Sequence, residues 1–217
     1  MEDKTFILGI DLSGPRNVAD TCVVAFEPNG EHLRFVQAIQ GADDEAIYNL
    51  VSTLGKQSRV VAGIDAPLSY NPGGGDRASD TSLRRAVKEK GRVGIMPPTL
   101  IRMVYLTLRG IALTRTLEAL KPQIDIALVE VHPGACMLLR GAPASDVADL
   151  KREASARLRL LEWMESMGLS SIPWVEETSD HFVAACSAAL AAWKWSTGNA
   201  AWCHPAQLPE HPYDFAC

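Results

Sequence analysis

Three acidic residues stand at the ends of short apolar runs, and they are the residues of this chain best placed to do chemistry. Two of the runs end in the same three residues, Gly-Ile-Asp, at Asp11 and Asp65, and a third run leads to Glu130. A short apolar run without polar alternation is typical of a strand that is buried on both faces. We therefore expect three buried strands that each carry a carboxylate at the carboxyl end.

If these strands are parallel, their carboxyl ends meet at one edge of the sheet, where open α/β sheets bind ligands. Clustered negative charges are costly unless a cation neutralises them, and carboxylate oxygens are the ligands that Mg²⁺ and Mn²⁺ prefer. The sequence therefore predicts a Mg²⁺ or Mn²⁺ site with Asp11, Asp65 and Glu130 as catalytic metal ligands. The alternatives are a turn cap for Asp11, at Ser13-Gly14, and a salt bridge to a nearby arginine for Glu130.

A histidine lies two residues beyond the third acid, at the same predicted edge of the sheet. His132 is a candidate general acid that protonates the leaving oxygen of a substrate. The alternative is structural, because His132 precedes Pro133-Gly134 and such a sequence is typical of a turn.

A basic segment accompanies the acids. Residues 76–115 hold nine Lys or Arg against three Asp or Glu, a local net charge of +6 in a chain whose total is −5. Arginine binds phosphate through two parallel hydrogen bonds. We expect this segment to face a phosphate-bearing substrate, with solvated helix surfaces as the alternative. The candidate substrate-binding residues are Ser13, Arg77, Asp80, Arg84 and Arg109.

The bulk composition is that of a globular protein with an ordinary content of charge and nearly half apolar residues. No apolar run approaches the roughly 18 residues that a membrane helix needs, and the charged start lacks a signal-peptide pattern. We expect a cytoplasmic protein without membrane contact. The five cysteines are scattered and lack a C-x-x-C pair, so we expect reduced thiols and no zinc.

The order of elements along the chain predicts the fold class. Strands at 5–11, 21–26 and 33–39 form a meander, followed by a helix from Asp43, a strand at 59–64 and helices at 78–90 and 99–120. A strand at 125–131, a turn at 132–134, a helix at 149–167, a helix from 179 to about 195 and an irregular tail complete the chain. This order is typical of a ribonuclease-H-like three-layer α/β/α fold with a five-stranded mixed sheet and an antiparallel second strand. We expect one domain over residues 1–217, with helical insertions at about 66–122 and 134–170.

Six short motifs follow one another along the chain. They are Gly9-Ile10-Asp11-x-Ser13-Gly14-Pro15, Gly63-Ile64-Asp65-Ala66-Pro67-Leu68, Arg77-x-x-Asp80-x-x-Leu83-Arg84, Leu106-Thr107-x-Arg109-Gly110, Val129-Glu130-Val131-His132-Pro133-Gly134-Ala135, and Asp180 before Val183-Ala184-Ala185. In this order they resemble a family of uncharacterised bacterial and archaeal proteins that are described as predicted nucleases with a ribonuclease-H-like fold. The chain departs from the family pattern at His181, where a small residue is usual, and at the loose triple glycine of residues 73–75.

The resemblance implies a last catalytic and metal-binding acid on the closing helix, which points at the first strand; here that residue is Asp180. Its alternative is an ordinary helix cap. The leading hypothesis is a metal-dependent nuclease or phosphodiesterase that acts on nucleic acid or another phosphate-bearing substrate. Two alternatives stay open: an actin-like or sugar-kinase-like ATP-binding protein, and a non-catalytic binding protein on the same fold. The oligomeric state does not follow from the sequence.

Overall fold

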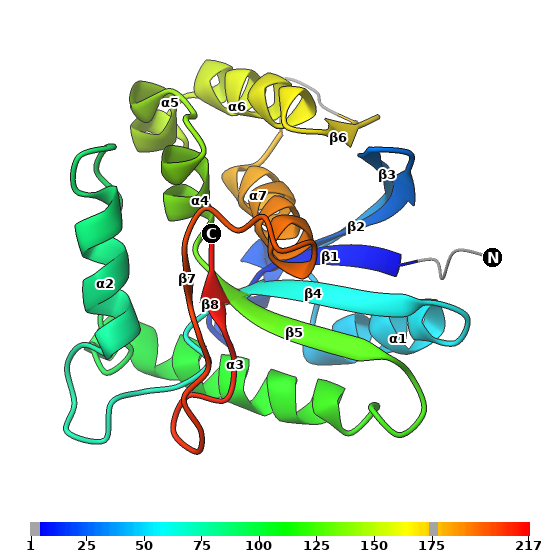
Figure 1. The fold of residues 1–217 in the computed structure, drawn as a ribbon, viewed down its shortest axis with the longest axis vertical. Helices are drawn as coiled ribbons and strands as arrows, with labels where there is room; N and C mark the ends of the chain where they lie inside the picture. Colours follow the sequence, from blue (N-terminus) through cyan, green and yellow to red (C-terminus); the bar gives the residue numbers. More distant parts are fainter. Residues whose placement is uncertain (1–4, 174–177) are drawn as a thin grey trace.

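The computed structural model describes residues 5–173 and 178–217, which form an α/β fold around a mixed sheet (Figure 1). The sheet has eight strands in the order β6-β3-β2-β1-β4-β5-β8-β7. The strands are β1 (Thr5–Asp11), β2 (Cys22–Asn29), β3 (His32–Gln40), β4 (Arg59–Asp65), β5 (Ile126–Val131), β6 (Leu169–Ser170), β7 (Cys203–His204) and β8 (Phe215–Ala216).

Seven α-helices and one short 3-10 helix are described around this sheet. They are η1 (Val18–Asp20), α1 (Asp44–Gly55), α2 (Ala78–Val87), α3 (Ile101–Glu118), α4 (Pro133–Leu139), α5 (Ala144–Asp149), α6 (Ala154–Ser166) and α7 (Asp180–Ser196). No helix among the described residues is long and apolar enough to span a bilayer.

The centre of the sheet confirms the predicted strands. β1 pairs in parallel with β4, and β4 in parallel with β5, while β2 runs antiparallel to β1. The prediction of five strands is wrong, because three further strands, β6, β7 and β8, extend the sheet at both sides. Each of them has two residues, too few to show the alternation by which a strand is found in a sequence.

Three local predictions are also wrong. Residues 132–134 do not form a turn beyond the strand but begin α4, with His132 as its cap. The helix predicted at 149–167 begins only at Ala154, as α6, and a separate short helix, α5, precedes it. The break between them places Leu150 and Lys151 beside the cavity described below. The tail is not wholly irregular, because Phe215 and Ala216 are buried against β5 and pair with it.

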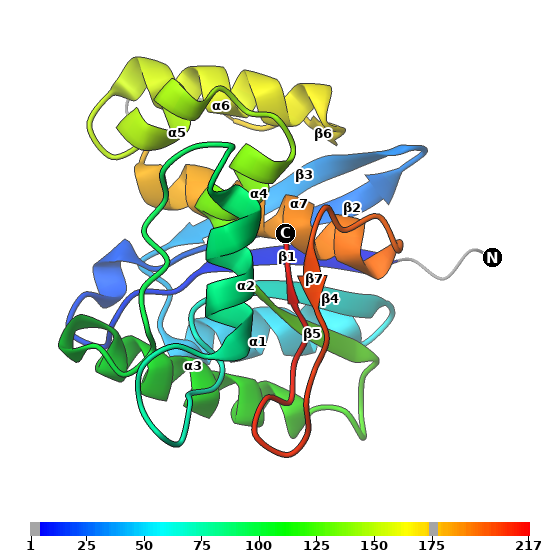
Figure 2. The same ribbon diagram turned by 60° about the vertical axis from the view of Figure 1, so that its left-hand side comes forward.

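Helices cover both faces of the sheet, which gives three layers. α7 lies across one face, and α1 and α3 lie along the other (Figures 1 and 2). Two separate clusters of buried apolar side chains fill the space between the layers, one that includes α4, α6 and α7, and one that includes α1 and α3. The two faces of each central strand therefore belong to different cores.

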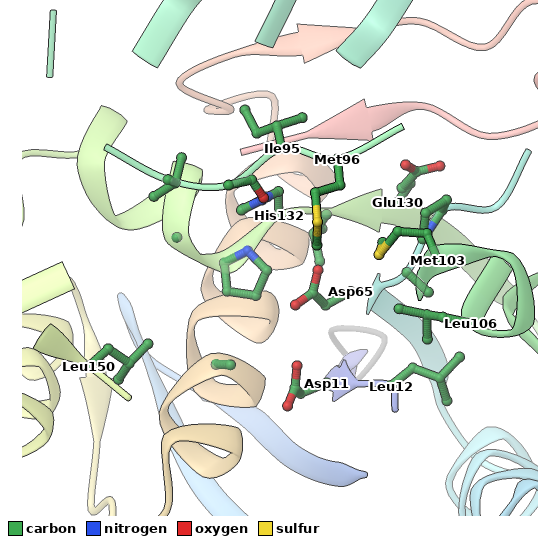
Figure 3. Close-up of a pocket in the computed structure, with 18 of the residues that line it drawn as sticks. Asp11, Leu12, Asp65, Ile95, Met96, Met103, Leu106, Glu130, His132 and Leu150 are labelled. Carbon is green, nitrogen blue, oxygen red and sulfur yellow. The ribbon is translucent and has the colours of Figure 1, made fainter. Parts of the chain in front are cut away.

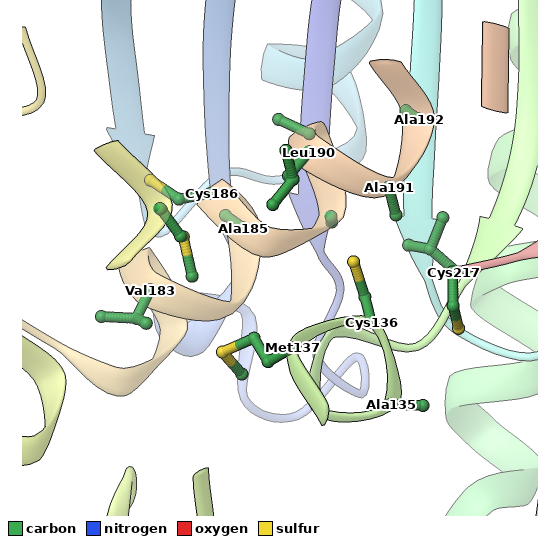
Figure 4. Packing of buried hydrophobic residues seen from close by; sticks show 14 of the residues in the cluster. Ala135, Cys136, Met137, Val183, Ala185, Cys186, Leu190, Ala191, Ala192 and Cys217 are labelled. Atoms are coloured by element: carbon green, nitrogen blue, oxygen red, sulfur yellow. The ribbon is translucent and has the colours of Figure 1, made fainter. Parts of the chain in front are cut away.

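Small residues let α7 lie unusually close to the sheet. A Cβ atom added at Gly9 of β1 would come within 1.9 Å of the Ala185 carbonyl oxygen, and one at Gly63 of β4 within 2.6 Å of the Ala188 oxygen. The helix itself is rich in alanine on this side, as the close-up of the core shows (Figure 4). This contact fixes the start of α7 near the carboxyl ends of β1 and β4.

Candidate active site

The two Gly-Ile-Asp motifs form one site. Asp11 and Asp65 are direct partners in the parallel pairing of β1 with β4. Because partners in a sheet point to the same face, both side chains face the α7 side. Their carboxyl groups share a hydrogen bond, and the pKa of Asp65 is raised well above its usual value. The causes are burial, then the charge of Asp11, this hydrogen bond and the charge of Glu130. A pair in this state holds a proton in place of a second charge.

Glu130 lies at the same edge but on the other face of the sheet. It pairs with Ile64, one residue before Asp65, and Ile64 belongs to the core beneath α1 and α3. Side chains alternate between the faces of a strand, so this shift of one residue separates Glu130 from the two aspartates.

The Glu130 carboxylate is held by a buried arginine. Arg77 donates from Nη1 to Oε2 at 2.8 Å and from Nη2 to Oε1 at 2.5 Å, and the Leu68 backbone N–H donates to Oε2 at 2.9 Å. The same guanidinium binds Asp80 through Nε and Nη2, and all three charged side chains are at most 5 % exposed. The salt bridge that was the alternative for Glu130 is therefore present. The sequence predicted that Arg77 and Asp80 bind substrate. In the structure the hydrogen-bond donors of Arg77 are already taken up by Asp80 and Glu130, and Asp80 is bound to Arg77.

The first turn of α7 brings a histidine to the aspartate pair. Ser179 caps this helix, since its side chain accepts the Phe182 backbone N–H, so Asp180 is not the cap. His181 places Nδ1 2.6 Å from Oδ2 of Asp11, and its Nε2 lies 3.9 Å from Asp180 Oδ1. The hydrogen bond with Asp11 raises the pKa of His181, against the effect of its burial.

From the sequence, His181 could be an extra ligand or a proton shuttle, but a surface or core histidine is more common, so it is not among the predicted site residues. The available signal was its position directly after Asp180, at the start of the closing helix. That signal is weak, because a histidine at a helix start is an ordinary surface residue. Only the close approach of α7 to β1 reveals the contact with Asp11.

A cavity of about 520 Å³ opens over the two aspartates (Figure 3). Asp11 and Asp65 point into it, and Asp180 and His181 line it as well. Much of its wall is apolar. Those side chains include Leu12, Ile95, Met96, Met103, Leu106, Val147 and Leu150.

Two cationic side chains, Arg92 and Lys151, also line the cavity. Lys151 acts electrostatically on Asp65 and favours its charged form. Neither cation forms an ion pair with another residue in the described part of the chain. Both positive charges therefore stay available to a ligand.

His132 lines the same cavity but is already engaged. Its Nδ1 accepts the Ala135 backbone N–H as the cap of α4, and its Nε2 lies 3.3 Å from the Gly94 carbonyl oxygen. These contacts suit the neutral tautomer with the proton on Nε2. Burial lowers its pKa below the usual value. Its proposed role as a general acid stays a prediction, and its contacts are those of a helix cap.

Three further predicted residues hold the edges of the site. Arg109 is buried and donates to the Ser13 carbonyl oxygen at 2.9 Å and to Thr21 Oγ1 at 2.7 Å. Arg109 also binds Asp44, so it ties the loop after β1 to the start of α1. Arg84 pairs with Asp76 and donates from Nε to the Ile95 carbonyl oxygen at 2.9 Å. It therefore supports the wall of the cavity formed by residues 92–96.

The predicted metal ligands fit a cation in part. Within residues 5–173 and 178–217, no group of three or more His, Cys, Asp or Glu side chains is arranged to hold a metal ion. Mg²⁺, however, is commonly bound through one or two carboxylates, with waters and substrate phosphates as the other ligands. Asp11 and Asp65 fit that pattern, and Asp180 lines the same cavity. Glu130 does not fit it, because both of its oxygens accept hydrogen bonds from Arg77.

Comparison with known proteins gives one match. A family model described as "Protein of unknown function (DUF429)" matches residues 9–212, which include every site residue described above. No curated protein and no solved structure matches the chain.

Proposed function

We propose that this chain, which belongs to the DUF429 family because the family model spans residues 9–212, is a divalent-metal-dependent nuclease or phosphodiesterase. The observation that carries the proposal is the pair of Asp11 and Asp65, in register on two parallel strands and joined by a hydrogen bond in a cavity. A buried carboxyl pair that retains a proton in the absence of metal can exchange that proton for Mg²⁺ or Mn²⁺.

The arrangement of the central strands supports a ribonuclease-H-like architecture for this enzyme. The order β3-β2-β1-β4-β5, with β2 antiparallel to its neighbours, and the closing helix packed on β1 and β4 are those expected from the sequence. The three two-residue strands lie outside this unit of five strands. Nucleic acid is the substrate class that this architecture favours.

The roles of the residues follow from their contacts. Asp11 and Asp65 would hold the metal ion, and Asp180 is placed to join them. A divalent cation held there would supply activation of a water and would offset negative charge on a phosphate. His181 orients the Asp11 carboxylate through Nδ1, and Lys151 supplies a positive charge for the substrate phosphate.

Glu130 and Arg77 have a supporting role in this proposal. Their hydrogen bonds join β5 to the segment before α2 and to Leu68 in the loop after β4. This buried network holds the carboxyl edge of the sheet in place beneath the cavity.

The test is cleavage of a labelled oligonucleotide with Mg²⁺ or Mn²⁺, and its loss in EDTA. Asp11→Asn and Asp65→Asn should each lower the rate by roughly a thousandfold or more, since each removes a negative charge that holds the metal. Asp125→Asn is the matched control, because Asp125 is exposed at the opposite edge of the sheet. Equal rates in all three variants would overturn the proposal, and ATP turnover without cleavage would favour the ATP-binding alternative.

A further inference from the structure

The wall of the cavity beside the aspartates is an apolar lobe formed by Met96, Met103 and Leu106. These side chains come from the segment before α3 and from the first two turns of that helix, and Leu12 of the loop after β1 lies next to them (Figure 3). Methionine adapts its shape to flat or irregular partners and makes favourable contacts with aromatic rings. The lobe therefore suits a flat, apolar group such as a nucleic-acid base.

Two polar side chains of the cavity wall already have hydrogen-bond partners within the fold. Arg77 is saturated by Glu130 and Asp80, and both ring nitrogens of His132 have backbone partners. Reading of a base edge needs free donors and acceptors at defined positions. A base in this lobe would be held by surface contact alone, without strong preference for its identity.

Two cations of the cavity wall complement a phosphate. Lys151 lines the cavity and acts electrostatically on Asp65. Arg92 adds a second cation to the cavity wall, on the segment that Arg84 supports. The apolar lobe, the carboxylate pair and the cations thus line one cavity, as the base and the metal-bound phosphate of one nucleotide require.

The size of the cavity limits what can enter. A volume of about 520 Å³ lies in the range of sites for small ligands. A duplex keeps its bases paired and stacked, so it presents no free base to such a lobe unless a nucleotide is extruded.

We infer that the cavity takes one unstacked nucleotide at a time, with the base between Met96, Met103 and Leu106 and the phosphate over Asp11 and Asp65. This inference rests on the proposed function and names its substrate class: single-stranded ends or short oligonucleotides, with tolerance for any base.

Calorimetric titration in Mg²⁺ tests this, with adenosine 5′-monophosphate, thymidine 5′-monophosphate and inorganic phosphate as probes. The monophosphates contain no diester to cleave, so binding is measured apart from turnover. Both nucleotides should bind about tenfold tighter than inorganic phosphate, because the contacts of two methionines with an aromatic ring together amount to about that factor. The affinities of the two nucleotides should differ from each other by less than about tenfold.

Met103→Trp fills the lobe and should weaken nucleotide binding about tenfold while the affinity for inorganic phosphate stays the same. Leu108→Trp is the matched control, since Leu108 is exposed on the same helix and should change neither affinity. Should Met103→Trp not fold, Met96→Trp replaces it, because Met96 lies on the same wall and is partly exposed. Nucleotide affinities that no substitution in the lobe changes would overturn the inference.

Competition in Ca²⁺, a cation that takes carboxylate and other oxygen ligands as Mg²⁺ does, separates this inference from the proposed function. A single-stranded dinucleotide should displace a fluorescent nucleotide, and a short blunt duplex should not; equal displacement by the duplex would overturn the single-nucleotide inference even if cleavage is found. Conversely, nucleotide binding of the expected pattern without any metal-dependent cleavage would overturn the proposed function and leave the single-nucleotide cavity standing.

Discussion

Asp11 and Asp65 are partners in the pairing of β1 with β4, and their carboxyl groups are joined by a hydrogen bond on the face that α7 covers. Glu130 ends the next strand but pairs with Ile64, so its side chain leaves the opposite face and binds Arg77. All three acids line the cavity, but Asp11 and Asp65 act as a pair on one face of the sheet, whereas the charge of Glu130 is neutralised by Arg77. This division leads to different expectations for each acid.

The aspartate pair should make the metal-free protein less stable as the pH rises. The pKa of Asp65 is raised above its ordinary value of 3.8, so the folded state binds this proton more tightly than the unfolded chain. The resulting stability is fully present below the ordinary pKa and is lost as the pH rises through the raised one. Urea unfolding in EDTA over a series of pH values should show this decline, and Asp65→Asn should reduce it. Asp125→Asn should leave the decline as it is, and an unchanged slope in Asp65→Asn would contradict the expectation.

Arg77 should be far more important for stability than a surface arginine. Arg77→Met leaves Glu130 and Asp80 buried without their partner, which should lower the free energy of unfolding by about 3–5 kcal/mol. Arg59→Met removes an exposed ion pair with Asp125 and should cost at most about 1 kcal/mol. Chemical denaturation of both variants measures the difference. Similar losses in the two would show that the Arg77 network does not hold the edge of the sheet.

Gly9 should tolerate no side chain, because α7 lies against it. Gly9→Ala forces the helix and β1 apart, and we expect a loss of stability of about 1–3 kcal/mol. The same displacement moves His181 away from Asp11, so cleavage should fall too. Gly14→Ala is the matched control, since a Cβ there meets nothing within 4 Å. Thermal unfolding measures the loss of stability, and the cleavage assay measures the loss of activity. A fully stable and active Gly9→Ala variant would contradict the close packing.

His181 should act through Asp11 and not on the substrate itself. Removal of a residue that orients a metal ligand typically costs about 10–100-fold in metal affinity or activity. We expect His181→Ala to weaken Mn²⁺ binding to that extent by calorimetry, and His181→Asn, which retains a polar group near Asp11, to lose less. His32→Ala alters an exposed histidine on β3 and serves as the control. Unchanged Mn²⁺ affinity in His181→Ala would show that its contact with Asp11 has no part in the site.

The central strands and the closing helix could be predicted from the sequence because their signals are local. The apolar runs before Asp11 and Asp65 indicate buried strands by composition alone, and Ser179 with Asp180 marks the start of α7. Strands of two residues, such as β8, leave no such signal, and neither does the break between α5 and α6. These features depend on tertiary contacts: β8 pairs with β5, and residues in the break line the cavity.

Tertiary structure determines which of the candidate residues belong to the site. The sequence places Asp11, Asp65 and Glu130 at strand ends, but the register between strands is a long-range property, and a shift of one residue turns a side chain to the other face. Because of that shift, the Glu130 side chain lies on the face where Arg77, some fifty residues away in the chain, binds it. Likewise, the small residues at Gly9 and Ala185 allow α7 to approach β1, and this approach brings His181 to Asp11. Residue types thus determined which groups are available for chemistry, and packing determined which of them meet.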